Sequence, residues 1–201
     1  MMDADTFTRA FLGTYFLLIG LHYTSTSLGL SSRTGISHIH YGARFSATWW
    51  YRHLFNLFRA SILGICLARI AFPIDPWLGV FTPLYQPAVL LTGVVLLLVS
   101  FCVIDYVHAY MHQDWRTGIN PDSNSTLLTE GPFGWSRNPL FIGILTGQIG
   151  LFLALPSWFT LVCLIVGTLV IILQARAEER TLRQRHGDSY THYARRVRRW
   201  F

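Results

Sequence analysis

Residues 129–143 (TEGPFGWSRNPLFIG) place turn formers, an arginine and a helix start directly before a long uncharged run. Asn is a preferred N-cap, and Pro at the first helical position loses no needed donor, so Asn138-Pro139 predicts a helix start. The free N–H groups there, with Arg137 beside them, suit a carboxylate or phosphate. Gly131 would let the backbone approach a ligand closely. The alternative is a well-formed helix start whose arginine only sets the topology.

Two adjacent acids, Glu178 and Glu179, lie just beyond the same uncharged run and are followed by Arg180 and Arg183. Glu179 and Arg183 are four residues apart, so they could pair on a helix surface. Two acids at a membrane boundary could instead bind an amino group, a ribose hydroxyl pair or a cationic ligand. The residue types leave both alternatives open.

Asp105, His108 and His112 are spaced three and four residues apart, which places them on one helix face. Imidazole and carboxylate are common metal ligands. No clear fourth ligand and no HExxH or CxxC pattern accompanies them. The sequence therefore favours a polar pocket wall that faces other helices, and we expect no metal site.

Nucleotide-binding and hydrolase motifs are missing from the sequence: it has no GxGxxG after a strand, no GxxxxGK[ST] and no GxSxG. A nucleotide-like cofactor would therefore not be held by a Rossmann or P-loop device. We expect no nucleic-acid partner, because the chain has neither a recognition module nor a soluble surface to carry one.

The elements that must position these residues are membrane helices. The 201 residues are 52% hydrophobic and only 13% charged, about half the charge of a soluble domain. No Asp, Glu, Lys or Arg occurs in residues 10–32, 76–104 or 138–175. Each run exceeds the roughly 20 apolar residues that cross a bilayer core. The composition predicts an all-α, polytopic membrane helix bundle.

We expect five transmembrane helices, at about residues 8–30, 54–74, 87–110, 139–155 and 158–175. No basic segment precedes the first helix and no cleavage site follows it, so we expect a retained helix and not a removed signal peptide. Pro156-Ser157 divides the third uncharged run, which favours a C-terminal helical hairpin over one long kinked helix.

Arginine supplies all of the basic charge apart from histidine, and half of the arginines lie between Arg176 and Arg199. By the positive-inside rule, the loop 111–137 and the C-terminus should be cytoplasmic. The absence of lysine suggests a GC-rich bacterial genome and hence the bacterial inner membrane. Arg59 and Arg69 fall inside the second span near its ends, where we expect their side chains to snorkel.

The tail after residue 175 should extend the last helix to about His186, where Gly187 ends it. A second short segment follows, whose apolar residues recur at helical spacing: Tyr190, Tyr193, Val197 and Trp200. This pattern predicts a helical tail that lies at the membrane surface or packs back on the spans.

These motifs together resemble the small integral-membrane methyltransferases, a family that includes isoprenylcysteine carboxyl methyltransferases and phospholipid N-methyltransferases. The resemblance covers about residues 114–201 and rests on three stretches: WRTG (115–118), LLTEGPFGWSRNPLFIG (127–143) and AEERTLRQRHGDSYTHYARRVRRW (177–200). It divides the chain into N-terminal transmembrane helices with a cytoplasmic loop, residues 1–110, and a catalytic region, residues 111–201.

The resemblance implies S-adenosylmethionine (SAM) as methyl donor, bound between the loop, the last two spans and the tail. The cofactor-binding residues that it implies are Gly131, Pro132, Phe133, Arg137, Asn138, Pro139, Phe141, Gly143, Glu178 and Glu179. Many relatives have His where this chain has Asn138, and Tyr where it has Phe133 and Phe141. Asn is neither an acid nor a base near neutral pH, so we expect no proton transfer at position 138.

The implied methyl acceptor is lipophilic or small: a prenylcysteine-type carboxylate, a phospholipid amine or a thiol, with membrane lipids around it. A carboxylate needs no base, whereas an amine or thiol first loses a proton. Glu179 and His112 are the candidates for that step. Arg137 or Arg116 would hold an anionic acceptor or the cofactor carboxylate, and Trp115 would contact the sulfonium through its ring face.

Two other functions are compatible with the sequence. Membrane sterol-type reductases that use NADPH resemble the same C-terminal motif, but they are roughly twice as long and have more spans. A non-catalytic membrane adaptor that keeps the fold would account for the arginine-rich tail. This function would not explain the loop or the Glu178-Glu179 pair.

Overall fold

The computed structural model describes residues 3–34, 44–111 and 127–200, which form helices and the turns between them. In chain order the helices are α1 (Ala4–Thr34), α2 (Ala47–Ala71), α3 (Asp75–Leu78), η1 (Thr82–Leu84), α4 (Pro87–Met111), η3 (Gly131–Gly134), α5 (Pro139–Ala154) and α6 (Trp158–Arg196). In these ranges the β-type pairing is an isolated bridge between Val80 and Ser157. The predicted all-α class is confirmed.

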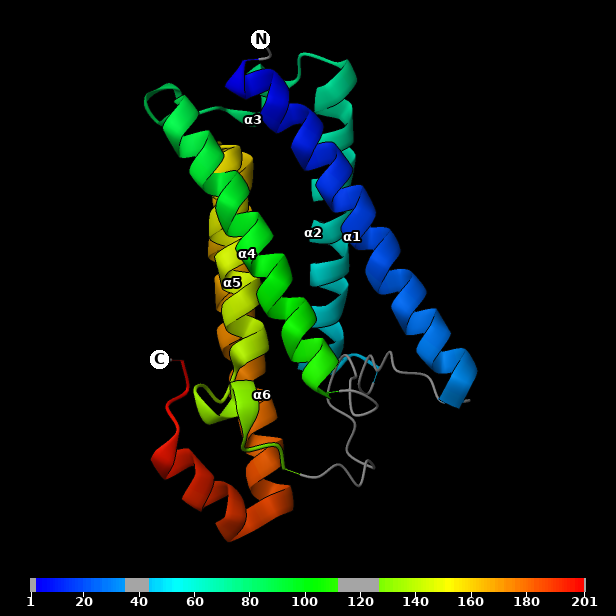
Figure 1. Cartoon of the computed structure of the whole chain (residues 1–201), viewed down its shortest axis with the longest axis vertical. Coiled ribbons are helices and arrows are strands. Elements are labelled where there is room, and N and C mark those ends of the chain that lie inside the picture. The colour runs from blue at the N-terminus through cyan, green and yellow to red at the C-terminus, as the bar shows by residue number, and fades with distance from the viewer. Residues whose placement is uncertain (1–2, 35–43, 112–126, 201) are drawn as a thin grey trace.

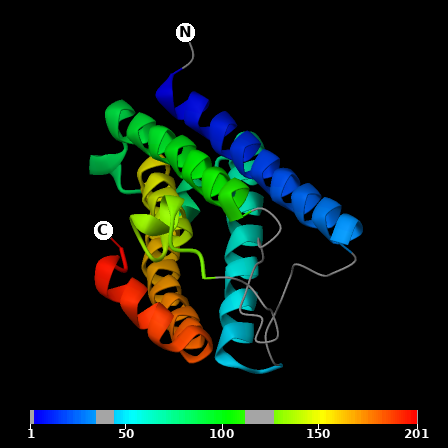
Figure 2. The same cartoon turned by 60° about the horizontal axis from the view of Figure 1, so that its bottom comes forward.

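The five long helices form one elongated bundle (Figure 1). α4 packs closely against α5, and α1 packs against α2 and α4. α6 runs alongside α5 and also contacts α2; Figure 2 shows these helices with the lower end of the bundle turned forward. The N-terminus lies at one end of the bundle, whereas η3, the end of α6 and the C-terminus lie at the other.

Three of the predicted spans are helices long and apolar enough to cross a membrane: Trp49–Ala71, Pro87–Met111 and Trp158–Arg196. α5 is apolar but has only 16 residues, or about 24 Å of helix. α1 has 31 residues, but a stretch rich in Ser and Thr makes its second half less apolar. The apolar part of α6 ends at Ala175, and its charged part from Arg176 onward continues beyond a bilayer core of about 30 Å.

Small residues form the contact between α4 and α5. A Cβ added at Gly93 would overlap the backbone of Gly150 and Ala154, and one added at Gly147 would meet the side chain of Ser100. Small residues allow helix backbones to approach closely inside membranes, where packing drives association. This contact fixes α5, and so the loop before it, relative to α4.

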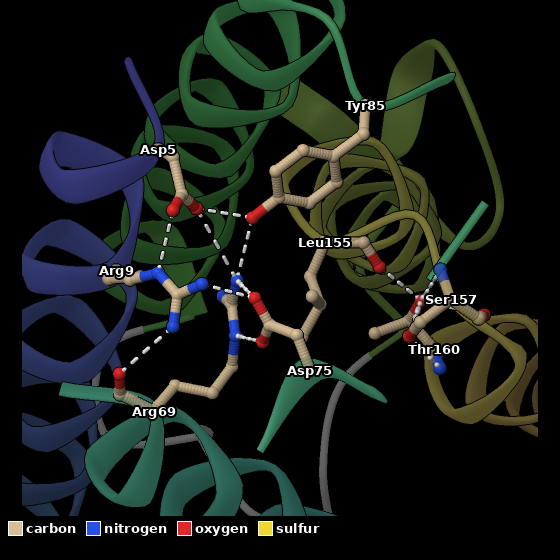
Figure 3. Close-up of polar contacts among 8 residues, drawn as sticks. All are labelled: Asp5, Arg9, Arg69, Asp75, Tyr85, Leu155, Ser157 and Thr160. Atoms are coloured by element: carbon tan, nitrogen blue, oxygen red, sulfur yellow. Dashed lines mark hydrogen bonds and ion pairs between the residues drawn. The ribbon is translucent and has the colours of Figure 1, made fainter. Parts of the chain in front are cut away.

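The predicted helical hairpin between α5 and α6 is confirmed, because α5 ends at Ala154 and α6 begins at Trp158. Ser157 caps α6: its Oγ accepts from the Thr160 N–H, and the Thr160 hydroxyl accepts from the Ser157 N–H. The Thr160 hydroxyl also donates to the Leu155 carbonyl, as Figure 3 shows. The alternative of one long kinked helix is wrong.

The tail folds back after a break in α6 at Gly187, where φ is 51° and ψ is −119°. A positive φ favours glycine, which has no Cβ to clash. The prediction that Gly187 ends the long helix and that an amphipathic helical segment follows is confirmed. The buried residues of this segment and their partly buried neighbours form one cluster: Tyr190, Tyr193, Val197, Leu127 and Leu182.

A network of charged side chains joins α1, α2 and α3 at the N-terminal end of the bundle (Figure 3). We call it the N-terminal network, and its members are Asp5, Arg9, Arg69, Asp75 and Tyr85. Arg69 donates to Asp75 at 2.6 Å and to the Tyr85 hydroxyl at 2.8 Å. Arg9 donates to Asp5 at 2.9 Å and also to Asp75, and the Tyr85 hydroxyl donates to Asp5.

The Arg69 side chain is 0% exposed, so the expectation that it snorkels is wrong. A buried arginine is tolerated when carboxylates neutralise it and accept its hydrogen bonds. Asp75 and, at 3.8 Å, Asp5 fill this role. Of its nitrogen atoms, Nη1 has no hydrogen-bond partner in the described part of the chain.

Candidate functional site

Three of the predicted site residues, Arg137, Asn138 and Glu179, come together where three segments meet at the C-terminal end of the bundle. η3 and the start of α5 form one side, and α6 beyond its apolar part forms the second. The last residues of the tail close the arrangement through hydrogen bonds to both sides. We call Arg137, Asn138, Glu179 and Arg199 the Glu179 cluster.

Glu179 is the buried centre of the cluster, with 8% of its surface exposed. Arg199 donates to both carboxylate oxygens, from Nε at 2.8 Å and from Nη2 at 2.9 Å. Asn138 Nδ2 donates to Oε1 at 3.2 Å, and Arg137 Nη1 lies 3.7 Å from Oε2. In the described residues these contacts take the place of the Glu179–Arg183 pair that the spacing allowed.

The charge state of Glu179 follows from these contacts. Burial acts to raise the pKa of Glu179, but the hydrogen bonds from Arg199 and Asn138 and the charge of Arg137 outweigh it. The net effect is a pKa below the ordinary value for a glutamate. Glu179 is therefore an ion-paired carboxylate at neutral pH and a weak proton acceptor.

Asn138 occupies the predicted N-cap of α5, with Pro139 as the first helical residue, but its side chain makes no capping hydrogen bond. Its Nδ2 group donates instead to Glu179 and to the Arg199 carbonyl, each at 3.2 Å. Arg137 lies beside an anion of the chain itself, the Glu179 carboxylate, and the binding of a ligand anion at this helix start stays a prediction.

Glu178, the other predicted acid, makes a different contact: its Oε1 accepts from Gln174 Nε2 at 3.1 Å. Burial raises the pKa of Glu178 to about 7, and the Gln174 hydrogen bond offsets only part of this effect. The two adjacent acids therefore differ, because their surroundings raise the pKa of Glu178 and lower the pKa of Glu179. Acids whose surroundings push their pKa values apart are typical of sites that combine binding with proton transfer.

The loop before α5 rests on the end of α4. Gly131 has φ 58°, and a Cβ added there would overlap the ring of Tyr110. The centroid of the Phe133 ring lies 6.3 Å from that of the Tyr110 ring. Pro132, which precedes Phe133 in the sequence, is half-buried. These contacts explain the turn residues of the loop by packing, and a cofactor contact from the same residues stays a prediction.

Phe141 and Gly143 contact other helices and not the Glu179 cluster. Phe141 is 7% exposed and packs against α6. A Cβ added at Gly143 would press on Ile104 of α4, and the Gly143 carbonyl accepts from the Ser100 hydroxyl at 2.8 Å. Their observed contacts are those of the helix bundle, so a cofactor-binding role for either residue stays a prediction.

A cavity of about 350 Å³ adjoins the Glu179 cluster. We call it the arginine cavity, because its lining is Arg176, Arg180, Arg183, Arg199 and Glu179. The three arginines of α6 are spaced four and three residues apart, so they share one face of the helix. The cavity wall is therefore dominated by guanidinium groups.

The predicted polar face of α4 contacts α1. His22 Nε2 lies 3.1 Å from Asp105 Oδ1, and the rings of Tyr23 and His108 meet edge to face with their centroids 5.3 Å apart. Asp105 and His108 thus face another helix, as the prediction of a polar wall requires.

Three predicted site residues, His112, Trp115 and Arg116, lie outside the described residues, so their roles stay predictions. Within residues 3–34, 44–111 and 127–200, no group of three or more His, Cys, Asp and Glu side chains could hold a metal ion.

Sequence reasoning missed the residues that attach the tail to the loop. Ser136 donates to the Arg199 carbonyl at 3.0 Å, and the Tyr193 hydroxyl donates to the Phe133 carbonyl at 2.7 Å. The VRRW stretch at 197–200 was the signal, since it carries the arginine that binds Glu179. Nothing in the spacing says which of its arginines turns inward.

In comparisons with known proteins, a family model described as phospholipid methyltransferase matches residues 88–189. The match spans half of the chain and runs from the start of α4 past the break in α6. It takes in α4, which the sequence resemblance did not reach, together with Asn138 and Glu179, and it ends before Arg199. No curated protein and no solved structure matches the chain.

Proposed function

The chain belongs to the phospholipid methyltransferase family, and we propose that it transfers a methyl group from SAM to a lipophilic or small acceptor. The observation that carries this proposal is the Glu179 cluster within and beside the matched region. A buried carboxylate there holds together the loop, α6 and the tail. This rigid arrangement stands directly beyond the apolar part of α6.

Several groups of the site are complementary to SAM, which carries a carboxylate, an ammonium group, ribose hydroxyls and a sulfonium. Arg137 Nε is buried and has no hydrogen-bond partner in the described part of the chain, so it can donate to a carboxylate. Glu178 can accept from the ammonium group or a hydroxyl. The rings of Phe133 and Trp135 belong to the same loop and suit contact with a sulfonium.

Bound SAM supplies a methyl group on a positively charged sulfur, and the residues of the chain position it and exclude water. Such a displacement depends on alignment in a dry pocket. Arg137 and Asn138 are held by Glu179, so their donors keep one orientation. We assign Glu179 a positioning role, because an ion-paired carboxylate with a lowered pKa is a poor base.

A proton acceptor is needed only when the methyl acceptor is an amine or a thiol. Among the described residues of the site, Glu178 suits this step, because burial raises its pKa to about 7. His112 stays the other candidate for the base. Arg137 takes either the cofactor carboxylate or an anionic acceptor.

We place this site on the cytoplasmic side, with the loop 111–137 and the tail, because the basic residues gather there. The acceptor class follows from the location: a lipophilic molecule held in the membrane, or a small molecule that enters from water. Turnover of a labelled methyl group against lipid extract, a prenylcysteine analogue and small thiols in parallel distinguishes carboxylate, amine and thiol acceptors.

Calorimetry on the purified protein in detergent tests the cofactor. We expect saturable heat from SAM and from its demethylated product, and a large loss of both in Arg137→Ala. Arg195→Ala is the matched control, because Arg195 is exposed and lies outside the cluster. If neither SAM nor its demethylated product gives heat with folded protein, the proposal is wrong. Heat from NADPH in place of SAM would favour the reductase. If SAM, its demethylated product and NADPH all fail to bind, the adaptor would be favoured.

A further inference from the structure

We propose that residues 72–86 lie at the boundary between lipid headgroups and acyl chains, at the membrane face opposite the Glu179 cluster. There they cover the tip of the α5–α6 hairpin, which ends inside the bilayer core. We call these residues the cover segment; they join α2 to α4 and include α3 and η1. The inference does not depend on methyl transfer. It rests on the depth of the tip, on its hydrogen bonds to the segment and on the exposed side chains of the segment.

The tip of the hairpin, residues 155–157, does not reach the end of the bundle. A Cβ added at Gly93 would overlap Ala154, the last residue of α5. Gly93 is six residues after Pro87, where α4 begins, so the tip lies about 9 Å of helix short of that end of α4. In Figure 1, α3 lies above the top of α5 and α6. α5 has only 16 residues, or about 24 Å of helix, so the tip ends inside a bilayer core of about 30 Å.

Backbone groups at this depth need protein partners, because the bilayer core has no water to replace them. The cover segment provides two. The Phe81 N–H donates to the Pro156 carbonyl at 2.8 Å. The Trp158 N–H donates to the Gly79 carbonyl at 3.1 Å. These hydrogen bonds lie on either side of the isolated β-bridge, and Ser157 of the tip is 0% exposed. The segment therefore shields the polar backbone of the tip from lipid.

The outward surface of the cover segment is apolar and aromatic. Its one charged residue, Asp75, accepts hydrogen bonds from Arg9 and Arg69 in the N-terminal network. Trp77 is 89% exposed, and Phe72 is 62% exposed. Tryptophan is enriched at the membrane boundary, where its ring lies in an apolar layer and its N–H stays close to water. These side chains fit that boundary, whereas exposure of the same surface to water is unfavourable.

The surface of the cover segment is also continuous with the lipid-facing surface of the spans that it joins. Ile70, near the end of α2, is 53% exposed, and Leu91, near the start of α4, is 43% exposed. Exposed apolar side chains on membrane helices face acyl chains. The boundary layer directly above these chains is therefore where the segment lies, and lipid is the partner that we assign to it.

Tryptophan fluorescence of the full chain in phosphatidylcholine vesicles tests the location. The acyl chains carry bromine either near the glycerol or near the chain end, and the difference in emission between wild type and Trp77→Phe reports Trp77. Trp77→Phe/Asp188→Trp is the matched control. It keeps the number of tryptophans and moves one indole to an exposed position beyond the charged part of α6.

We expect bromine near the glycerol to quench Trp77 at least about twofold more than bromine near the chain end, and aqueous acrylamide to quench it at least about twofold less than the indole at position 188. Equal acrylamide quenching at the two positions would place the segment in water. Strongest quenching by bromine near the chain end would place it in the core. Protection of Trp77 from both bromines and from acrylamide would show that protein covers it. Each of these three results overturns the proposal.

Hydrogen exchange in the same vesicles tests the cover over the hairpin tip. Gly79 has φ 64°, and a Cβ added there would lie 2.7 Å from Cδ1 of Trp158. Gly79→Ala should therefore loosen both hydrogen bonds and accelerate exchange of the Phe81 and Trp158 amides at least about tenfold. Gly64→Ala is the control, because its added Cβ would meet no atom within 4 Å.

Exchange that Gly79→Ala leaves unchanged, or that Gly64→Ala accelerates equally, would show that the segment does not cover the tip. The wild type alone decides the question if Gly79→Ala does not fold. Slow exchange of the two amides supports the cover, and exchange as fast as in an unstructured peptide overturns it.

Discussion

The two ends of the bundle each carry arginines paired with buried or half-buried carboxylates, but the charges balance at only one of them. In the N-terminal network, two aspartates face two arginines, and Tyr85 bridges between them. At the other end, the Glu179 cluster and the arginine cavity together place five arginines around Glu179.

This difference indicates that the N-terminal network has a structural role, whereas the Glu179 cluster and the arginine cavity are suited to binding. A balanced network satisfies its own charges, and it joins α1 to α2 and α3, whose contacting residues lie 60 and 66 residues further along the chain. It leaves no charge for a ligand to neutralise. In the Glu179 cluster, the carboxylate attaches the tail through Arg199. The arginines of the adjoining arginine cavity keep an excess of positive charge. We expect variants of the first region to affect stability alone, and variants of the second to affect binding and turnover as well.

The largest expected effect is that of Glu179→Ala on methyl transfer. Removing a buried carboxylate leaves Arg137 and Arg199 without their common partner, and breaking a buried pair in this way costs about 3–5 kcal/mol. Turnover of a labelled methyl group should fall at least about a hundredfold, and hydrogen exchange of residues 188–200 should accelerate. Glu130→Ala is the control, because Glu130 is exposed on the same loop. Turnover close to wild type in Glu179→Ala would contradict the positioning role.

Arg69→Met tests the other side of the comparison. Arg69 is buried and neutralises Asp75, so its removal leaves Asp5 and Asp75 to share Arg9. Breaking a buried pair in this way should cost about 3–5 kcal/mol of stability. The thermal midpoint of the protein in detergent should fall, while SAM affinity per folded molecule stays unchanged. A loss of SAM affinity without a loss of stability would show that the N-terminal network is not merely structural.

Local sequence signals predicted the helices but not the partners of the charged residues. Pro156-Ser157 and Gly187 marked a turn and a break because their backbone preferences act within a few residues. Arg69 and Asp5 are 64 residues apart, and Arg199 reaches Glu179 only after the chain reverses at Gly187. Such pairings depend on the whole bundle. The burial of Arg69 also depends on it, although the nearer partner Asp75 is only six residues away, and this explains why the Arg69 prediction was wrong.

The same distance effect explains the partial success at Asn138. Its place at the start of α5 follows from the residue types of Asn-Pro, which are a local signal. Its hydrogen bonds to Glu179 and to the Arg199 carbonyl require two further segments to arrive beside it. Sequence spacing therefore predicted the helix start at Asn138, but not the side chains that meet there; the site that it places on this loop and helix stays a prediction.

The pH dependence of stability provides a third test, because Glu179 and its arginines form a titratable link. The folded-state pKa of Glu179 lies below its ordinary value, so the link stabilises the fold above that ordinary value, near pH 4.5. The stabilisation is lost as the pH falls through the folded-state pKa. The melting temperatures of wild type and Glu179→Gln should therefore differ at pH 6 and converge toward pH 3. A constant difference over this range would show that ionisation of Glu179 does not hold the tail.

The smallest expected effects come from two tyrosine hydroxyls, one at each end of the bundle. The Tyr193 hydroxyl donates to the Phe133 carbonyl at 2.7 Å, and the Tyr85 hydroxyl accepts from Arg69 and donates to Asp5. Burial raises the pKa of each tyrosine to about 12, so both hydroxyls keep their proton at neutral pH. Each bond is expected to contribute about 1 kcal/mol.

Replacement of these tyrosines by phenylalanine separates the two regions with one chemical change. Tyr193→Phe should release the tail locally, with roughly fivefold faster exchange of residues 188–200 and little change in melting temperature. Tyr85→Phe should lower the melting temperature and leave exchange in the tail unchanged, because its hydroxyl joins helices and not a terminal segment. The reverse pattern would mean that the tail is part of the cooperative core, and then the contrast between a structural network and a binding site would not hold.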